Sequence, residues 1–154
     1  MAIDKMDWHW ADTEKLYRKT HEIEGDLSDQ QQVEIALMAS NHIGLFLQWV
    51  FEMGFAGEDT NAEDVEKVRQ GEMLGVFYFL QHCDGKLWYE DISEDLHPFV
   101  QSYYEESDDY LRDYCISCID DDTAPLYGVI SGQESYEKLK EKIDAAYKSF
   151  LEKE

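Results

Sequence analysis

The sequence predicts an all-α fold, arranged as a single compact helical bundle that spans residues 1–154. Apolar residues recur at spacings of three and four along most of the chain, which is the period of an amphipathic helix. No Ser-, Gly- or Pro-rich linker and no internal repeat divides the chain into parts. A chain of this length buries roughly 70% of the surface that its unfolded form exposes, which is enough for one core.

Four helices are expected in the first half of the chain, each between a capping residue and a stop signal. They run from Asp12 or Thr13 to Gly25, from Ser28 to Gly54, from Asn61 to Gly71, and from Met73 to the Asp84-Gly85 turn. The second of these helices either continues or breaks near Asn41. Its segment Ile43–Met53 is apolar on nearly every face, which is typical of the buried centre of a bundle.

Three further helices are expected in the second half of the chain. They run from Ser93 to Tyr103, from Ser107 to Cys118, and from Gln133 onward. Pro98 falls far enough inside the first of them to shorten or bend its opening turns. Between the last two helices, residues 125–132 are expected to form one short irregular or extended segment, and no partner strand is evident for it.

The charge of the chain is distributed unevenly. The formal net charge is -22, and the stretch from Asp84 to Asp122 holds thirteen acidic residues against two basic ones, a charge of -11. Seven aromatic residues are interleaved with these acids. Such a field repels nucleic acid and anionic lipid, whereas it attracts and orients a basic protein. We therefore expect a cationic protein partner and no direct contact with nucleic acid or a membrane.

Aromatic side chains within an acidic rim are the expected binding surface, because aromatics supply most interface energy while charges set rate and specificity. The alternative is plain surface acidity for solubility, but a net charge of -22 exceeds that need. The candidate partner-binding residues are Asp84, Trp88, Glu90, Asp91, Glu94, Asp95, Tyr103, Tyr104, Glu105, Glu106, Asp108, Asp109, Tyr110 and Asp113.

Enzyme and metal chemistry have weaker support in the sequence. Cys115 and Cys118 have CxxC spacing, but they fall late in an expected helix in an acidic region, where a thiolate is disfavoured. Cys83 and His82 could join them around zinc in principle, without the two closely spaced ligand pairs of a structural zinc site. The run Asp120–Asp122 lacks the spacers of a calcium loop. No catalytic residue, metal or cofactor is therefore expected, and the protein is not expected to be an enzyme.

The N-terminal aromatic cluster and one histidine allow two interpretations each. Trp8 and Trp10 beside His9 could form a recognition patch, but such a cluster more often packs the first helix onto the bundle. His42 lies on the most apolar helix, where a hydrogen-bonded core histidine is favoured over a ligand role.

The expected location is the cytoplasm. The first ten residues lack the basic start and apolar run of a signal peptide. The most apolar stretch, Ile43–Phe51, is far shorter than the ~20 residues that span a bilayer. Three cysteines are an odd set, which fits a reducing compartment better than a disulfide framework.

Several segments together resemble a bacterial domain family of unknown function whose members are similar to immunity proteins of polymorphic toxin systems. The resembling segments are Asp4-Lys5-Met6-Asp7-Trp8-His9-Trp10, Asn41-His42-Ile43-Gly44-Leu45-Phe46-Leu47-Gln48-Trp49, Cys83-Asp84-Gly85-Lys86-Leu87, Glu90-Asp91-Ile92-Ser93, Tyr103-Tyr104 and Tyr110-Leu111-Arg112-Asp113-Tyr114. The stretch Thr13–Met38 is longer than the corresponding segment of that family. The resemblance implies a small cytoplasmic helical protein linked to toxin neutralisation.

Charge and resemblance lead to the same functional hypothesis. We expect an acidic immunity protein that binds and occludes a cognate, basic antibacterial toxin without turnover. The alternative is a nucleic-acid mimic or adaptor that sequesters a basic DNA-binding protein, with carboxylates standing where phosphates would lie. The two differ in selectivity, because a mimic should bind several unrelated basic proteins whereas an immunity protein binds one toxin.

Overall fold

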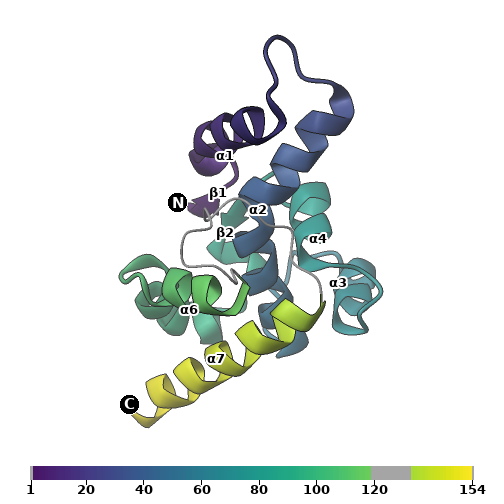
Figure 1. Cartoon of the computed structure of the whole chain (residues 1–154). Helices are drawn as coiled ribbons and strands as arrows, with labels where there is room; N and C mark the ends of the chain where they lie inside the picture. The colour runs from purple at the N-terminus through teal and green to yellow at the C-terminus, as the bar shows by residue number, and fades with distance from the viewer. Residues whose placement is uncertain (1, 119–132, 154) are drawn as a thin grey trace.

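A computed structural model describes residues 2–118 and 133–153 and confirms the mostly helical fold class (Figure 1). Within these described residues, seven α-helices are joined by three short turns of other helical types, the 3₁₀ turns η1 and η2 and the π-helix η3, and two short strands pair with each other. In chain order the elements are β1 (Ala2–Lys5), α1 (Asp7–His21), α2 (Asp29–Glu52), α3 (Ala62–Arg69), α4 (Gly75–His82), β2 (Lys86–Trp88), η1 (Tyr89–Asp91), η2 (Glu94–Leu96), α5 (His97–Val100), η3 (Gln101–Glu105), α6 (Asp109–Cys118) and α7 (Gln133–Glu152).

Helix α2 is the axis of the molecule. Ser28 and Gln31 form a capping box at its N-terminus, as the sequence predicts for Ser28. The helix passes through Asn41 without a break, and every residue from 39 to 51 is buried. Figure 1 shows α1, α4, α6 and α7 arranged around it. The apolar segment of α2 from residue 39 to 51 is therefore covered on all sides, as its sequence predicts.

Two glycines allow α2 and α4 to approach each other closely. A Cβ atom on Gly44 would lie 2.4 Å from the Cα atom of Val76, and one on Gly75 would lie 2.1 Å from the carbonyl oxygen of Gly44. The side chain of Gln48 accepts a hydrogen bond from the Gly75 backbone N–H at 3.0 Å, which satisfies a donor in the first turn of α4. The crossing of these helices thus depends on backbone contact, and neither glycine position has space for a side chain.

The two-stranded antiparallel sheet was not predicted from the sequence. It pairs Ala2 with Trp88, Asp4 with Leu87 and Lys5 with Lys86, and its register is irregular between Ala2 and Asp4. Strands of four and three residues are too short to show a recognisable alternation of apolar and polar positions. The extended segment expected near residues 125–132 lies outside the described residues.

Two of the expected helices differ from the prediction in their bounds. Helix α1 begins at Asp7, so Thr13 lies buried inside it and its hydroxyl donates to the His9 carbonyl oxygen at 2.7 Å. The same helix ends at His21, and its C-cap residue Glu22 takes a left-handed conformation (φ 54°) before Gly25 is reached. The helix expected from Ser93 to Tyr103 is divided into η2, α5 and η3, and no side-chain cap forms at Ser93. Pro98 lies in the first turn of α5, where a proline is tolerated, and the α-helix begins there and not at Ser93.

One apolar core connects the elements. Buried residues from Ile3 in β1 to Ile143 in α7 form a single cluster, and aromatic rings make up much of its centre. The ring of Phe46 contacts four of these, namely Trp49, Tyr103, Tyr104 and Tyr110. Among the helices that the structure describes, none combines the length and apolarity required to cross a membrane.

Candidate functional site

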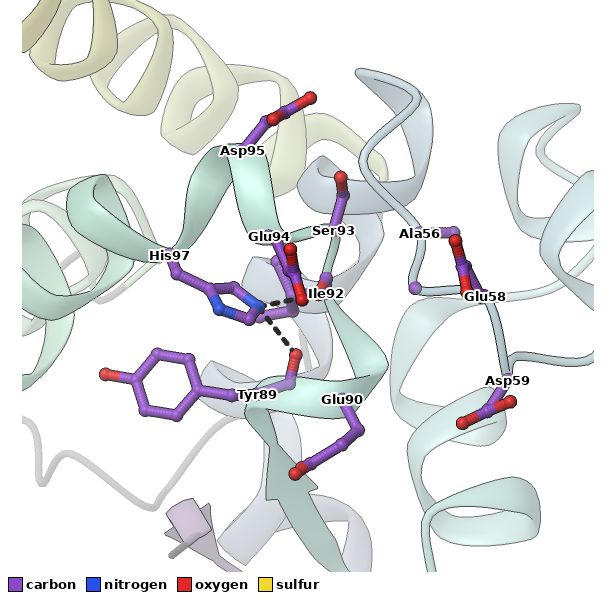
Figure 2. Close-up of a pocket in the computed structure, with 11 residues that line it drawn as sticks. Ala56, Glu58, Asp59, Tyr89, Glu90, Ile92, Ser93, Glu94, Asp95 and His97 are labelled. Carbon is purple, nitrogen blue, oxygen red and sulfur yellow. Dashed lines mark hydrogen bonds between the residues drawn. The ribbon is translucent and has the colours of Figure 1, made fainter.

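A pocket of about 480 Å³ opens where the loop after α2 meets the segment that follows β2 (Figure 2). Residues 56–59 line one side and residues of η1, η2 and the start of α5 line the other. The two sides are connected by backbone hydrogen bonds from the Gly57 N–H to the Asp91 carbonyl at 3.0 Å and from the Ser93 N–H to the Phe55 carbonyl at 2.7 Å. These bonds fix the two walls relative to each other.

Gly57 makes the close approach of the two walls possible. A Cβ atom at this position would lie 2.0 Å from the carbonyl oxygen of Glu90, which is well inside van der Waals contact. An isolated bridge between Ala56 and Ile92 lies beside it. Any larger residue at position 57 would separate the walls and change the shape of the pocket.

His97 holds the backbone of the second wall in place. Its Nε2 atom lies 2.8 Å from the Tyr89 carbonyl oxygen and 2.7 Å from the Ile92 carbonyl oxygen, so an N–H at this atom is shared between them (Figure 2). The imidazole also packs edge-on against the Tyr89 ring, with centroids 4.9 Å apart. Both ends of η1 are thereby connected to the first residue of α5. These hydrogen bonds hold the backbone of the second wall in a defined position.

Carboxylates dominate the side chains around this pocket. Five acidic residues line it, and all five are exposed: Glu58, Asp59, Glu90, Glu94 and Asp95. Its described lining contains no lysine or arginine, and no ion pair among the described residues involves any of the five. We call these five residues and their pocket the acidic pocket. Its charge and open carboxylates suit a cationic side chain of a partner.

The candidate acids from the sequence divide into three groups. Glu90, Glu94 and Asp95 line the acidic pocket, whereas four others are exposed elsewhere: Asp84, Glu105, Glu106 and Asp108. Of these four, Glu105 accepts a hydrogen bond from the Tyr89 hydroxyl. A third group makes internal bonds. Asp91 accepts from the Trp88 backbone N–H at 3.0 Å, Asp113 from the Tyr103 hydroxyl at 2.6 Å, and Asp109 pairs with Arg112 at 3.2 Å. Burial raises the pKa of Asp91, as expected for an acid with a structural role.

The tyrosines proposed as interface anchors lie inside the molecule. Tyr103 and Tyr110 are 4% and 1% exposed and belong to the core, so their assignment to an exposed binding surface is wrong. Tyr104 is half-buried, and its hydroxyl is directed at Asp4. The tyrosines of this region face inward because they fill the space between η3, α6 and α2, where an apolar ring with a hydrogen-bonded hydroxyl fits well.

The tryptophans behave differently. Trp8 is 57% exposed, so packing against the bundle, the interpretation favoured from the sequence, does not describe it. Trp88 is half-buried, and the Lys5 ammonium lies 5.6 Å from the centre of the Trp8 ring and 5.9 Å from that of Trp88. The two rings therefore hold one lysine between them at the surface.

Comparison with known proteins gives one match. A model of the family described as a domain of unknown function, DUF7832, matches residues 2–129. The chain belongs to the DUF7832 family. No curated protein and no solved structure matches the chain. The description of the family names no activity, so it supports neither toxin immunity nor any other function directly.

Two of the cysteines of this DUF7832 chain, Cys83 and Cys115, have thiols whose pKa is raised. Cys83 and Cys118 are buried and Cys115 is half-buried. Burial raises the pKa of the Cys83 thiol, and the neighbouring Asp91 raises it further. Burial also raises the pKa of Cys115. A reactive thiol requires the opposite shift, which gives physical support to their interpretation as core residues.

Sequence reasoning missed two groups of residues in the DUF7832 domain. Glu58 and Asp59 lie outside the acidic stretch that drew attention, and only the fold brings them opposite Glu94. The second group comprises the buried Asp4 and His42 with the half-buried His9 and Tyr104, and we call it the Asp4 cluster. The only signal for it in the sequence is the presence of acidic and histidine residues in two apolar segments, 2–10 and 39–51.

The Asp4 cluster gathers donors around one carboxylate. His9 Nε2 lies 2.7 Å from Asp4 Oδ1, and His42 Nε2 lies 3.2 Å from Asp4 Oδ2. The Tyr104 hydroxyl donates to Oδ2 at 2.7 Å, and the Lys5 backbone N–H donates to Oδ1 at 2.8 Å. Burial alone would raise the pKa of Asp4, but the hydrogen bonds from His42 and His9 hold it well below its usual range. Burial lowers the pKa of His42. This residue is a hydrogen-bonded core histidine, as the sequence predicts.

Proposed function

We propose that this DUF7832 protein is an acidic immunity protein, which binds a cognate basic antibacterial toxin in the bacterial cytoplasm and occludes it. The observation that carries the proposal is the acidic pocket, where five exposed carboxylates surround a cavity of about 480 Å³ without a lysine or arginine in its described lining. Close acids repel one another, and a cationic partner relieves that repulsion. A surface of this kind is therefore suited to receive Lys and Arg side chains.

The recognition would combine steering and local pairing. The net charge of -22 raises the rate of encounter with a basic protein, and this effect weakens as salt is added. At the pocket, a guanidinium can pair with a carboxylate through two parallel hydrogen bonds, which also fixes orientation. Fixed walls lower the cost of ordering the site when the partner binds. Occlusion needs no chemical step.

An aromatic contact is available on the same protein. Trp8 is largely exposed, and Trp88 is partly exposed beside it, with Lys5 between the rings. Exposed tryptophans are frequent anchors of protein interfaces. We assign to Trp8 and Trp88 the anchoring role that the sequence suggested for Tyr103 and Tyr110.

The test is rescue of growth in a co-expression assay. The protein is expressed with the toxin-like domain encoded beside its gene, and cell survival and complex formation on a sizing column are measured. We expect rescue by the wild type and its loss in the double variant Glu58→Lys and Glu94→Lys, which reverses one charge on each wall of the acidic pocket.

A matched control separates the pocket from net charge. The double variant Glu24→Lys and Asp26→Lys changes the net charge equally, at exposed positions in the loop before α2. That loop and the pocket lie at opposite ends of α2, which is about 36 Å long at 1.5 Å per residue. The control should rescue growth. Equal loss in both variants would contradict a role for the pocket, and no rescue by the wild type would contradict immunity. Binding to several unrelated basic proteins, in competition with duplex DNA, would favour the nucleic-acid mimic instead.

A further inference from the structure

The Asp4 cluster unites side chains from three elements at one point. Asp4 comes from β1, His9 from the first turns of α1, and His42 from the middle of α2. Their candidate ligand atoms, one carboxylate oxygen and two imidazole nitrogens, all lie within 4.8 Å of one another. Asp4 and His42 are buried, while the His9 side chain keeps 17% of its surface exposed. The cluster therefore has a buried floor and one edge that solvent reaches.

The set of donor atoms is one that metals use. Two imidazoles and a carboxylate form the protein part of catalytic zinc sites and of the facial triad that holds non-haem iron. Around a tetrahedral ion with bonds of about 2.1 Å, ligand atoms stand roughly 3.4 Å apart. His9 Nε2 lies 2.7 Å from Asp4 Oδ1 and His42 Nε2 lies 3.2 Å from Asp4 Oδ2, so both contacts are shorter than that value and the side chains would move apart to admit an ion. Small rotations of the side chains would allow all three to reach one ion.

The surroundings of the carboxylate resemble the outer shell of a metal site. The Tyr104 hydroxyl and the Lys5 backbone N–H each donate to one oxygen of Asp4, and such partners orient a ligating carboxylate. Tyr104 belongs to the π-helix η3, a rare element that occurs frequently at functional sites. The hydroxyl of Tyr110 donates to the carbonyl oxygen of His42 and fixes the backbone at that ligand.

Electrostatics favour a cation at this point. Asp4 brings a negative charge into a site where it is 6% exposed, and the whole chain carries a charge of -22. A buried charge is costly unless a partner of opposite charge compensates it. A divalent ion held by Asp4 and the two imidazoles would compensate this charge.

We propose that Asp4, His9 and His42 form a binding site for one divalent transition-metal ion of the zinc class, with Tyr104 positioning the carboxylate. The site is separate from the acidic pocket, whose carboxylates come from other elements. It is also independent of the proposed immunity function. The competing explanation is a purely structural cluster of hydrogen bonds that connects β1 and α1 to α2. Both explanations make the cluster important for stability, so only metal binding distinguishes them.

The test measures metal binding by the full chain. The purified protein is stripped with a chelator, dialysed, and titrated with Zn²⁺ by calorimetry and with Co²⁺ by visible absorption. We expect one ion per chain and a Co²⁺ spectrum of nitrogen and oxygen ligands. His9→Ala should weaken binding by more than the roughly 10–100-fold that is typical for loss of an outer-shell partner. Tyr104→Phe should weaken it within that outer-shell range.

His82→Ala is the matched control. His82 also lies beside an aspartate, Asp64, but no second histidine joins that pair among the described residues. Its loss should leave the affinity unchanged. Circular dichroism of His9→Ala would establish that it folds, and His9 is the partly exposed member of the cluster, so its loss should be tolerated. The proposal is overturned if the wild type binds no stoichiometric ion, if His9→Ala binds as tightly as the wild type, or if the Co²⁺ spectrum shows thiolate bands from the cysteines.

Discussion

The acidic pocket and the Asp4 cluster place their carboxylates in opposite environments, one exposed to water and the other buried. In the pocket five exposed acids lie together, and no lysine or arginine accompanies them in the described lining. In the cluster one acid is buried and meets donors from His9, His42, Tyr104 and the backbone of Lys5. A buried carboxylate needs hydrogen-bond donors within the protein. An exposed carboxylate is hydrated and is available to bind a partner. The comparison separates acids that stabilise the fold from acids that are free to bind.

The largest effect is expected at the Asp4 cluster. Asp4→Ala leaves His9, His42 and Tyr104 without their common acceptor inside the protein, and breaking such a buried charged network costs about 3–5 kcal/mol. The free energy of unfolding, measured by urea denaturation in the presence of a chelator, should fall by that amount. Asp12→Asn on the exposed face of α1 is the control and should stay within about 0.5 kcal/mol of the wild type. A loss below about 1 kcal/mol at Asp4 would remove the contrast between the two regions.

A smaller loss of stability is expected when the wall of the acidic pocket is changed. His97→Ala removes the donor shared by the carbonyls of Tyr89 and Ile92, and unsatisfied polar groups of this kind cost about 1–3 kcal/mol. The same variant should weaken binding of the basic partner, because η1 loses its connection to α5. Urea denaturation and the co-expression assay measure the two effects. An unchanged rescue of growth would show that the pocket does not depend on the fixed wall.

Asp64 provides an intermediate case, an acid that is 9% exposed and has charged partners. The hydrogen bond from His82 lowers the pKa of Asp64, burial opposes this, and Lys67 adds to the lowering. A pKa that is lower in the folded state contributes stability above the unfolded value of about 4, and this contribution disappears as the pH falls through the folded value. Asp64→Asn should therefore be less stable than the wild type at pH 7, and the two should converge at strongly acidic pH. Urea denaturation between pH 2 and 7 tests this, and a difference independent of pH would contradict it.

The smallest effect on stability is expected in the pocket itself. Glu58→Gln with Glu94→Gln removes two charges from opposite walls, and the free energy of unfolding should change by no more than about 0.5 kcal/mol. Because the variant relieves repulsion between neighbouring acids, any change should be an increase in the free energy of unfolding. The same variant should bind a basic partner less tightly and with a weaker dependence on salt. A clear loss of stability would mean that these acids, like Asp4, have partners in the fold.

Local signals in the sequence were enough for most of the helical architecture. Ser28 and Asn61 cap α2 and α3 because their side chains accept backbone N–H bonds within the same few residues. The buried middle of α2 follows from its apolar composition alone. Both features depend on neighbours in the chain, so a single sequence contains the information for them.

The parts that were missed depend on contacts between distant residues. The strand β1 exists because β2 pairs with it, and neither is long enough to be recognised alone. The acidic stretch predicted three of the five pocket acids, but Glu58 and Asp59 join them only through the bridge between Ala56 and Ile92. Tyr103 and Tyr110 have the composition of interface anchors, and only packing against Phe46 distinguishes a core tyrosine from an exposed one.

The bond between Tyr104 and Asp4 joins residues that are 100 positions apart. A ribosome adds about 5–20 residues per second, so the first strand waits roughly 5–20 s before its partners have been synthesised. Long-range contacts of this kind also slow folding of the complete chain, in contrast to the local contacts of the helices. The N-terminal strand therefore cannot complete its contacts until η3 has been synthesised. Chaperones and proteases would encounter α2 before its apolar side is covered, and a tag attached after α7 would disturb assembly less than one attached before β1.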